Sequence, residues 1–267
     1  MNNCPIFISS ADSYSDIWPI FFDLFKIYWP EYSGKIYLNT EEKTFSTEGL
    51  NIICTQVGYN KTFGITFRKG LDQIKSENIL LMMIDYIFMG KVNNKKIFEY
   101  FNFFVEKKLD SLCLTNQQYP NTKETDHKEL FMVTSPAPYI MFSYQIAFWK
   151  KSMLYQMALP HEDPWTSEWY GTLRAEKMHI KLAAVINEKY NPIPYHLAGC
   201  LHKGKWLSEA IEHLKSINYN VDFDKRGYYH ELPNTIKSRI IIKWKIVKVG
   251  LLGSYSDLIK RKNIYDN

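Results

Sequence analysis

The chain has 267 residues, of which 46% are apolar and 23% are charged, so it can fold as one large domain and is too apolar to be disordered. Its 12 glycines and 11 prolines exclude a collagen-like or low-complexity protein. The net charge of +5 comes entirely from residues 231–267, and the neutral remainder lacks the basic surface typical of nucleic-acid-binding proteins.

Short apolar runs, typical of buried strands, recur along the first half of the chain. The predicted strands are residues 6–10, 36–38, 51–54, 79–84 and 111–114, with another inside 141–151 that runs on into a helix. Their continuous apolar character indicates a sheet that is covered on both faces.

Amphipathic helical patterns lie between these runs. Ile17, Phe21, Leu24 and Phe25 share one face of a helix that is predicted from residue 15 or 16 to about Trp29. Further helices are predicted at 67–74, at 97–108, from 168 onward and at 207–214, and a long polar loop is predicted at 116–138. The alternation predicts an α/β protein with a mostly parallel central sheet and helices on both faces.

The cysteines and the apolar stretches indicate a cytoplasmic protein. Cys4, Cys54, Cys113 and Cys200 are too far apart for a metal or redox motif and are typical of reduced thiols. The chain begins without a signal-peptide pattern, and its longest apolar stretch, residues 79–90, is too short to cross a membrane.

Residues 231–267 are expected to form a separate basic, amphipathic helical segment after a domain of residues 1–230. The segment combines eight basic and three acidic residues with Trp244 and a series of aliphatic residues. This combination is typical of peripheral contact with an anionic membrane, here its inner face. The alternative is a helix that packs on the domain and leaves its lysines in solvent.

Polar residues follow two of the predicted strands, at the edge where parallel α/β sheets bind ligands. Ser9 and Ser10 end the first strand and Asp12 follows it, and Asp85 and Tyr86 follow the fourth. An acid at the end of an apolar strand can hold a divalent cation that bridges a diphosphate, and it can equally cap a turn.

Two later segments also carry candidate site residues. In residues 160–174, Glu162, Asp163 and Glu168 stand among tryptophans, where a carboxylate can acquire a raised pKa and act as a base; acids also favour a helix N-terminus. A glycine-containing turn with His202, Lys203 and Lys205 can close on phosphates or remain a solvated basic turn.

Together these segments resemble the GT-A fold glycosyltransferases, in particular bacterial sugar transferases found with capsule and lipopolysaccharide genes. The likeness extends over about residues 6–227, and the Pro-His-Glu-Asp-Pro-Trp sequence at 160–165 is its most specific part. The other segments that carry it are residues 10–18, 28–30, 36–41, 49–53, 80–88, 145–149, 166–174 and 203–206.

The resemblance implies transfer of a sugar from a nucleoside-diphosphate donor to a saccharide or lipid-linked saccharide acceptor, with inversion, in the synthesis of surface polysaccharides or other glycans. Asp85 is then the expected ligand of the metal and the diphosphate, with His202 as a second ligand of Mn²⁺ or Mg²⁺. Similar sequences usually carry two adjacent acids at this place, whereas this chain has Ile84 before Asp85.

The resemblance also assigns roles to the remaining candidates. Glu168 is the first choice for the general base because such enzymes often carry an arginine about six residues later, here Arg174; Glu162 is the second choice and Asp163 the third. The expected donor-binding residues are Ser9, Ser10, Asp12, Arg68, Tyr86, Arg174, Lys203 and Lys205. Trp165, Trp169 and Tyr170 are expected to form a stacking wall for acceptor sugars.

Two other functions are open at this point. With a single acid at Asp85, the chain can be a sugar-nucleotide- or glycan-binding protein that has lost turnover. A nucleotidyltransferase uses a similar sheet, but the glycine-rich, basic phosphate loop that such enzymes carry near the N-terminus is missing.

Overall fold

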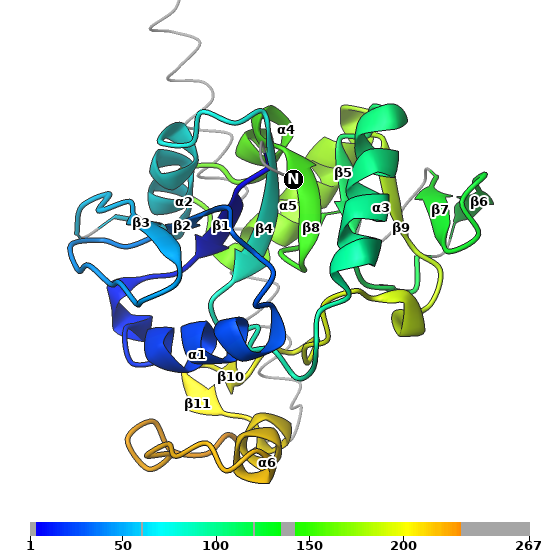
Figure 1. Cartoon of the computed structure of the whole chain (residues 1–267). Coiled ribbons are helices and arrows are strands. Elements are labelled where there is room, and N and C mark those ends of the chain that lie inside the picture. The colour runs from blue at the N-terminus through cyan, green and yellow to red at the C-terminus, as the bar shows by residue number, and fades with distance from the viewer. Residues whose placement is uncertain (1–3, 60, 120, 135–141, 231–267) are drawn as a thin grey trace, which may run out of the picture.

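A computed structural model of the chain describes residues 4–59, 61–119, 121–134 and 142–230 (Figure 1). Within these residues, nine strands form one sheet in the order β3-β2-β1-β4-β8-β5-β9-β7-β6. The strands are β1 (Ile6–Ser9), β2 (Lys35–Leu38), β3 (Asn51–Cys54), β4 (Asn78–Met83), β5 (Ser111–Cys113), β6 (Thr122–Glu124), β7 (Leu130–Val133), β8 (Ala147–Lys150) and β9 (Leu182–Val185).

Among these described strands, only β7 and β8 run against the common direction. The strand pairs β2–β3, β1–β2, β1–β4 and β5–β9 are parallel, whereas β8 is antiparallel to both β4 and β5. The carboxyl ends of β1, β4 and β5 therefore meet the amino end of β8 at one edge of the sheet. The expected α/β class with a mostly parallel central sheet is confirmed.

Helices cover both faces of the sheet because successive strand residues point to opposite sides. Ile6 and Ile8 of β1 belong to one apolar core, with residues of α1 (Trp18–Tyr28), α3 (Asn94–Glu106) and α6 (Ser208–Ser216). Phe7, between them, belongs to a second core with residues of α2 (Phe63–Asp72), α4 (Lys151–Met157) and α5 (Pro164–Lys177). The helices therefore form one layer on each face of the sheet (Figure 1).

Several elements differ from the sequence prediction. The predicted loop 116–138 contains β6 and β7, and β9 and the hairpin of β10 (Leu201–His202) with β11 (Lys205–Trp206) were not predicted. The helix predicted from residue 15 or 16 begins only at Trp18, after a 3₁₀ turn at Asp12–Tyr14, with Pro19 in its first turn. Proline is favoured there because the first helical N–H groups need no partner within the helix.

The predicted basic segment 231–267, and with it the boundary at residue 230, lies outside the described residues. The described helices include none that is both long and apolar enough to cross a membrane. All four cysteines are free thiols.

Candidate active site

A cavity of about 380 Å³ lies beyond the carboxyl ends of β1 and β4 and beside the start of β8. Its walls come from five parts of the chain: the β1 exit, the first residue of α2, the β4 exit, the β8 entrance with α5, and the turn before α6. The lining residues are Ser9, Ser10, Ala11, Tyr14, Phe63, Met83, Ile84, Asp85, Tyr86, Tyr144, Gln145, Pro164, Trp165, Glu168, Ala198, Leu201, His202, Lys203 and Gly204.

Asp85 brings a carboxylate into this cavity from the end of β4. Burial raises the pKa of Asp85 from 3.8 to about 7. The segment after residue 195 packs closely against it: the Cys200 N–H donates to the Asp85 carbonyl at 2.7 Å, and Gly199 has φ +77°. A Cβ at Gly199 would lie 2.7 Å from Asp85 Oδ2, so this position requires glycine both for its backbone conformation and for the space that Asp85 occupies.

Glu168 brings a second carboxylate into the cavity from α5. Its Oε1 accepts a 2.9 Å hydrogen bond from the Tyr144 backbone N–H, which holds the carboxylate toward the start of β8. Phe63, Pro164 and Trp165 line the cavity on the same side. Burial raises the pKa of Glu168, and the Tyr144 N–H acts in the opposite direction with less effect.

The wall formed by residues 198–204 contributes the basic side chains of the cavity lining, His202 and Lys203. His202 pairs with Lys205 across the β10–β11 hairpin, and the two residues between them, Lys203 and Gly204, have φ values of +50° and +77°. Two consecutive left-handed residues form the tight turn preferred in two-residue hairpins. Lys203 is exposed at the tip of this turn, whereas Lys205, on β11, is exposed and does not line the cavity.

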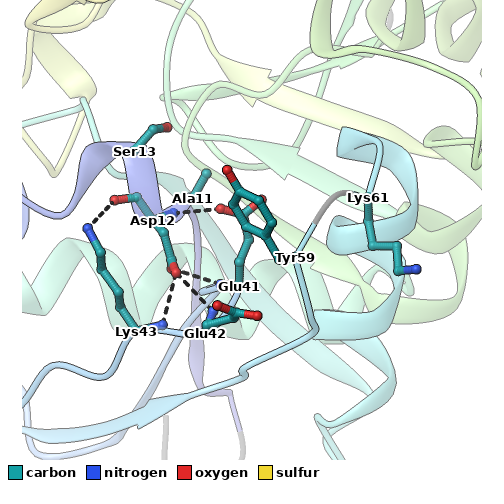
Figure 2. A pocket seen from close by; sticks show the side chains of 8 residues that line it. All are labelled: Ala11, Asp12, Ser13, Glu41, Glu42, Lys43, Tyr59 and Lys61. Carbon is teal, nitrogen blue, oxygen red and sulfur yellow. Dashed lines mark hydrogen bonds between the residues drawn. The ribbon is translucent and has the colours of Figure 1, made fainter.

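A second, more open cavity of about 670 Å³ adjoins the first through Ala11. It is lined by Ala11, Asp12, Ser13, Glu41, Glu42, Lys43, Tyr59 and Lys61 (Figure 2). Asp12 shapes this cavity: its carboxylate accepts 2.9 Å hydrogen bonds from the backbone N–H groups of Glu41, Glu42 and Lys43 (Figure 2). Although burial acts to raise the pKa of Asp12, these donors hold it below its ordinary value.

The other residues of the β1 and β4 exits also lie at the first cavity. Ser9 and Ser10 line it, and the Ser10 hydroxyl accepts a 2.8 Å hydrogen bond from Trp18 Nε1. Tyr86 lines it from the β4 exit and packs against Tyr195, with ring centroids 4.8 Å apart.

Two of the three candidate bases have structural roles instead. Glu162 is 2% exposed and is fully paired with Arg174, with Nη1–Oε1 and Nη2–Oε2 distances of 2.8 and 2.7 Å. Asp163 is the N-cap of α5 and forms a capping box with Thr166. Neither acid lines the first cavity, so Glu168 is the only one of the three in position to meet a substrate there.

The two arginines that were predicted to bind the donor are also engaged elsewhere. Arg174 is held by Glu162 and by the carbonyl of Met157. Arg68 donates to the carbonyls of Tyr155 and Ala158 and stacks on the Tyr155 ring at 3.8 Å, so it joins α2 to α4. Neither arginine lines the first cavity, and the Nη atoms that the structure pairs donate to carbonyls and, for Arg174, to the Glu162 carboxylate; Arg174 Nε is buried without a partner among the described residues.

The predicted aromatic wall divides into two parts. Trp165 lines the cavity and is 64% exposed, whereas Trp169 and Tyr170 lie on α5 outside the lining. Trp169 follows Trp165 by one helical turn and is also exposed.

Sequence reasoning missed three residues that shape the site. Tyr14 and Gln145 line the cavity. The Gln145 side chain also connects the start of β8 with residues 195–197: it accepts a 2.7 Å hydrogen bond from the Tyr195 hydroxyl and donates a 3.1 Å hydrogen bond to the Leu197 carbonyl. Arg226 lies behind the cavity and connects the β1 exit with the Lys203–Gly204 turn. No local pattern identifies such residues, because their partners are far away in the sequence.

A divalent cation would find a partial site in this cavity. Among the described residues, no group of three or more His, Cys, Asp or Glu side chains is arranged to hold a metal ion. Asp85 and His202 nevertheless line the same cavity, and the Asp85 carboxylate accepts a hydrogen bond from its own backbone N–H. One carboxylate and one imidazole fit a cation that takes its remaining ligands from substrate phosphates and water.

Comparisons with known proteins return distant structural similarities. No protein-family profile matches the sequence, and no curated protein matches it. A Staphylococcus aureus TarS fragment, residues 1–349, aligns over 72% of this chain and 59% of its own length, at 15% identity and a TM-score of 0.47. The bifunctional IspDF of Campylobacter jejuni aligns over 71% of this chain and 51% of its own, at 14% identity and a TM-score of 0.41.

A UDP-glucose pyrophosphorylase, solved in complex with UDP-glucose, aligns over 69% of this chain and 90% of its own length, at 10% identity and a TM-score of 0.43. The chain thus spans only about half to three fifths of the length of TarS 1–349 and IspDF.

Proposed function

We propose that the chain is a glycosyltransferase that moves a sugar from a nucleoside-diphosphate donor to a hydroxyl of a saccharide acceptor, with inversion. The observation that carries the proposal is that groups suited to binding a diphosphate and a group suited to accepting a proton line the same cavity. Asp85 and Lys203 line it together with Glu168, a carboxylate of raised pKa among aromatic side chains. The first two suit a metal-bound or lysine-bound diphosphate, and the third suits a base.

The adjoining cavities give the donor a place to lie. The open cavity beyond Asp12 offers the exposed ring of Tyr59 and the polar side chains of residues 41–43 to a nucleoside. It meets the Asp85 cavity at Ala11, so a nucleoside in this second, open cavity would extend its diphosphate past Ser9 and Ser10 toward Asp85. Asp12 then acts by holding the 41–43 backbone rather than by touching the nucleotide.

In the proposed reaction, Glu168 accepts the proton of the acceptor hydroxyl as that oxygen attacks the anomeric carbon. The bond between the anomeric carbon and the diphosphate oxygen breaks, and the developing charge on the sugar resembles that in glycoside hydrolysis. Lys203 lies where it can stabilise the departing diphosphate. Trp165 offers its ring to the acceptor at the mouth of the cavity.

Asp85 and His202 are the residues that would hold Mn²⁺ or Mg²⁺. The cation would neutralise charge on the leaving diphosphate. If it does so, Asp85→Ala should weaken nucleotide binding at least tenfold, and EDTA should do the same to the parent. Full binding by both the EDTA-treated parent and the variant would remove the metal from the proposal.

A panel of nucleotide sugars tests the function directly. The donor that fits should raise the melting temperature, since a ligand at 100 times its Kd stabilises a protein by about 2.7 kcal/mol. The same donor should be hydrolysed slowly and transferred when saccharide acceptors are added. Donor binding without hydrolysis or transfer would favour a binding protein that has lost turnover.

The basic segment 231–267 motivates a further part of the proposal, contact with the inner face of an anionic membrane. The full chain should bind vesicles of anionic lipid in a salt-sensitive manner, and a chain ending at residue 230 should not. Equal binding of the two would assign the segment to packing on the domain.

A further inference from the structure

A partly buried arginine connects two walls of the candidate active site that are far apart in the sequence. Arg226 Nε donates to Asp16 Oδ2 at 2.7 Å, and its Nη2 donates to Asp16 Oδ1 and to the Ser13 carbonyl. These partners lie 210 and 213 residues earlier, in the connection that leaves β1. The Asp16 and Arg226 side chains are 27% and 14% exposed.

The same guanidinium reaches the opposite wall. Arg226 Nη1 donates to the carbonyl of Gly204 at 3.3 Å, within the turn that presents Lys203 to the cavity. The guanidinium carbon also lies 5.1 Å from the ring centroid of Tyr14, a residue of the cavity lining. Arg226 itself does not line the cavity.

The turn that Arg226 holds is one that a lysine does not readily adopt. Lys203 has φ +50° at a position where asparagine, aspartate or glycine is preferred, because in the left-handed region a Cβ comes too close to the following carbonyl oxygen. Strained residues of this kind persist where the surroundings fix them, and they gather at ligand-binding sites. The contact of Arg226 with Gly204 is one such constraint.

We propose that Arg226 is a positioning residue, which fixes the Lys203–Gly204 turn against the β1 exit so that the Lys203 ammonium meets the diphosphate of the substrate. The proposal rests on the proposed function, because it takes a diphosphate as the ligand of Lys203. Two observations support it beyond the distances. The paired guanidinium holds the pKa of Asp16 below its usual range. The planar fork of arginine also suits this bidentate contact, which lysine cannot reproduce.

The test measures diphosphate binding to the full-length chain, with pyrophosphate, UDP, GDP, ADP and CDP as probes and calorimetry at 10 °C. The probe that binds the parent most tightly is then used for the variants. Arg226→Lys keeps the charge and removes the fork, and it should weaken binding about fivefold or more. Asp16→Asn breaks the same contact from the other wall and should have a similar effect.

Two controls separate positioning from charge and from stability. Lys225→Ala removes an exposed neighbouring cation and should bind as the parent does. The double variant, which carries Arg226→Lys and Lys203→Ala, should bind the diphosphate probe with an affinity within about twofold of that of Lys203→Ala alone. This is expected because both changes act through the Lys203 ammonium.

The outcomes distinguish the two proposals. A parent that binds none of the five probes overturns the proposed function and this inference together. A parent that binds, with Arg226→Lys and Asp16→Asn folded and binding equally well, overturns the positioning role alone. Additive losses in the double variant also overturn it, because Arg226 would then act independently of Lys203.

Discussion

Glu162 and Arg174 are joined by two parallel hydrogen bonds, 2.8 Å from Nη1 to Oε1 and 2.7 Å from Nη2 to Oε2. The Leu159 N–H also donates to Glu162 Oε2, and Arg174 Nη2 reaches the Met157 carbonyl. This pair therefore fixes the end of α4 to α5, the helix that carries Glu168 into the cavity.

Removal of the charge of Glu162 should destabilise the protein without removing activity. Glu162→Gln leaves a largely buried guanidinium without its counter-charge, which typically costs about 3 kcal/mol. We expect a lower urea midpoint, with turnover per folded molecule within about threefold of the parent. Glu212→Gln, on the exposed side of α6, is the matched control and should leave the midpoint unchanged. Loss of turnover in a fully folded Glu162→Gln protein would return Glu162 to the list of candidate bases.

Glu168→Gln should instead remove activity and leave stability nearly unchanged. The amide oxygen can still accept from the Tyr144 N–H, but it cannot take a proton from an acceptor. General-base catalysis contributes about 10²- to 10⁴-fold, so kcat should fall by that factor while nucleotide affinity stays within about threefold. Steady-state kinetics and calorimetry, with the donor that the panel of nucleotide sugars selects, measure the two quantities. An active, folded Glu168→Gln protein would exclude Glu168 as the base.

The raised pKa of Asp85 makes stability depend on pH in a predictable direction. Its pKa is about 7 in the folded protein against 3.8 ordinarily, so the folded chain holds a proton that the unfolded chain has lost between these values. The contribution of Asp85 to the unfolding free energy therefore falls as pH rises from about 4 to 7 and is constant above.

Asp85→Asn removes this penalty. In urea unfolding, the variant should gain about 2 to 4 kcal/mol over the parent at pH 8 and almost nothing near pH 4. An equal difference between variant and parent at the two pH values would mean that Asp85 titrates as an exposed carboxyl group does.

Lys203→Asn should raise stability and lower diphosphate affinity at the same time. Asparagine tolerates φ +50° better than lysine, so the turn should gain about 0.5 to 1 kcal/mol, measured as a higher melting temperature. Loss of the ammonium should weaken diphosphate binding about tenfold. A variant that is no more stable would show that the turn does not strain Lys203, and unchanged binding would place the diphosphate elsewhere.

The two exposed tryptophans of α5 should affect acceptors differently. Trp165→Ala should raise the acceptor KM about tenfold with little change in donor affinity, because an aromatic platform contributes roughly 1–2 kcal/mol through stacking. Trp169→Ala, one turn beyond the cavity, should affect only acceptors of several sugar units. The acceptor KM of both variants is measured with acceptors of increasing length. An equal rise in KM for a single-sugar acceptor in the two variants would contradict this prediction.

The sequence predicted the parts of the molecule that depend on local pattern. Apolar runs located β1 to β5, and strand ends placed Ser9 and Asp85 at one edge of the sheet. β6 escaped prediction because Thr122–Glu124 is entirely exposed and polar, and β9 because Leu182–Val185 has two alanines at its centre, which favour a helix.

Site residues were predictable only where their neighbours in sequence are also their neighbours in space. The capping role of Asp163 could have been found in the Asp-Pro-Trp-Thr sequence, which has an N-cap residue followed by proline. The pairing of Glu162 with Arg174, and of Asp16 with Arg226, depends on how helices and loops pack, and single-sequence patterns carry no such information.

The position of β8 determines when this pocket can come into existence during synthesis. β8 follows β4 and β5 in the chain but lies between them in the sheet, so residues 147–150 join two groups of strands that have no direct pairing with each other. Asp85 belongs to the first group, whereas Tyr144, which orients Glu168, stands at the entrance of β8 itself. A nascent chain that has released β5 but not yet residue 150 therefore has Asp85 without Glu168, His202 and Lys203, which follow later in the chain, and it exposes the open edges of β4 and β5 to any chaperone or neighbouring chain.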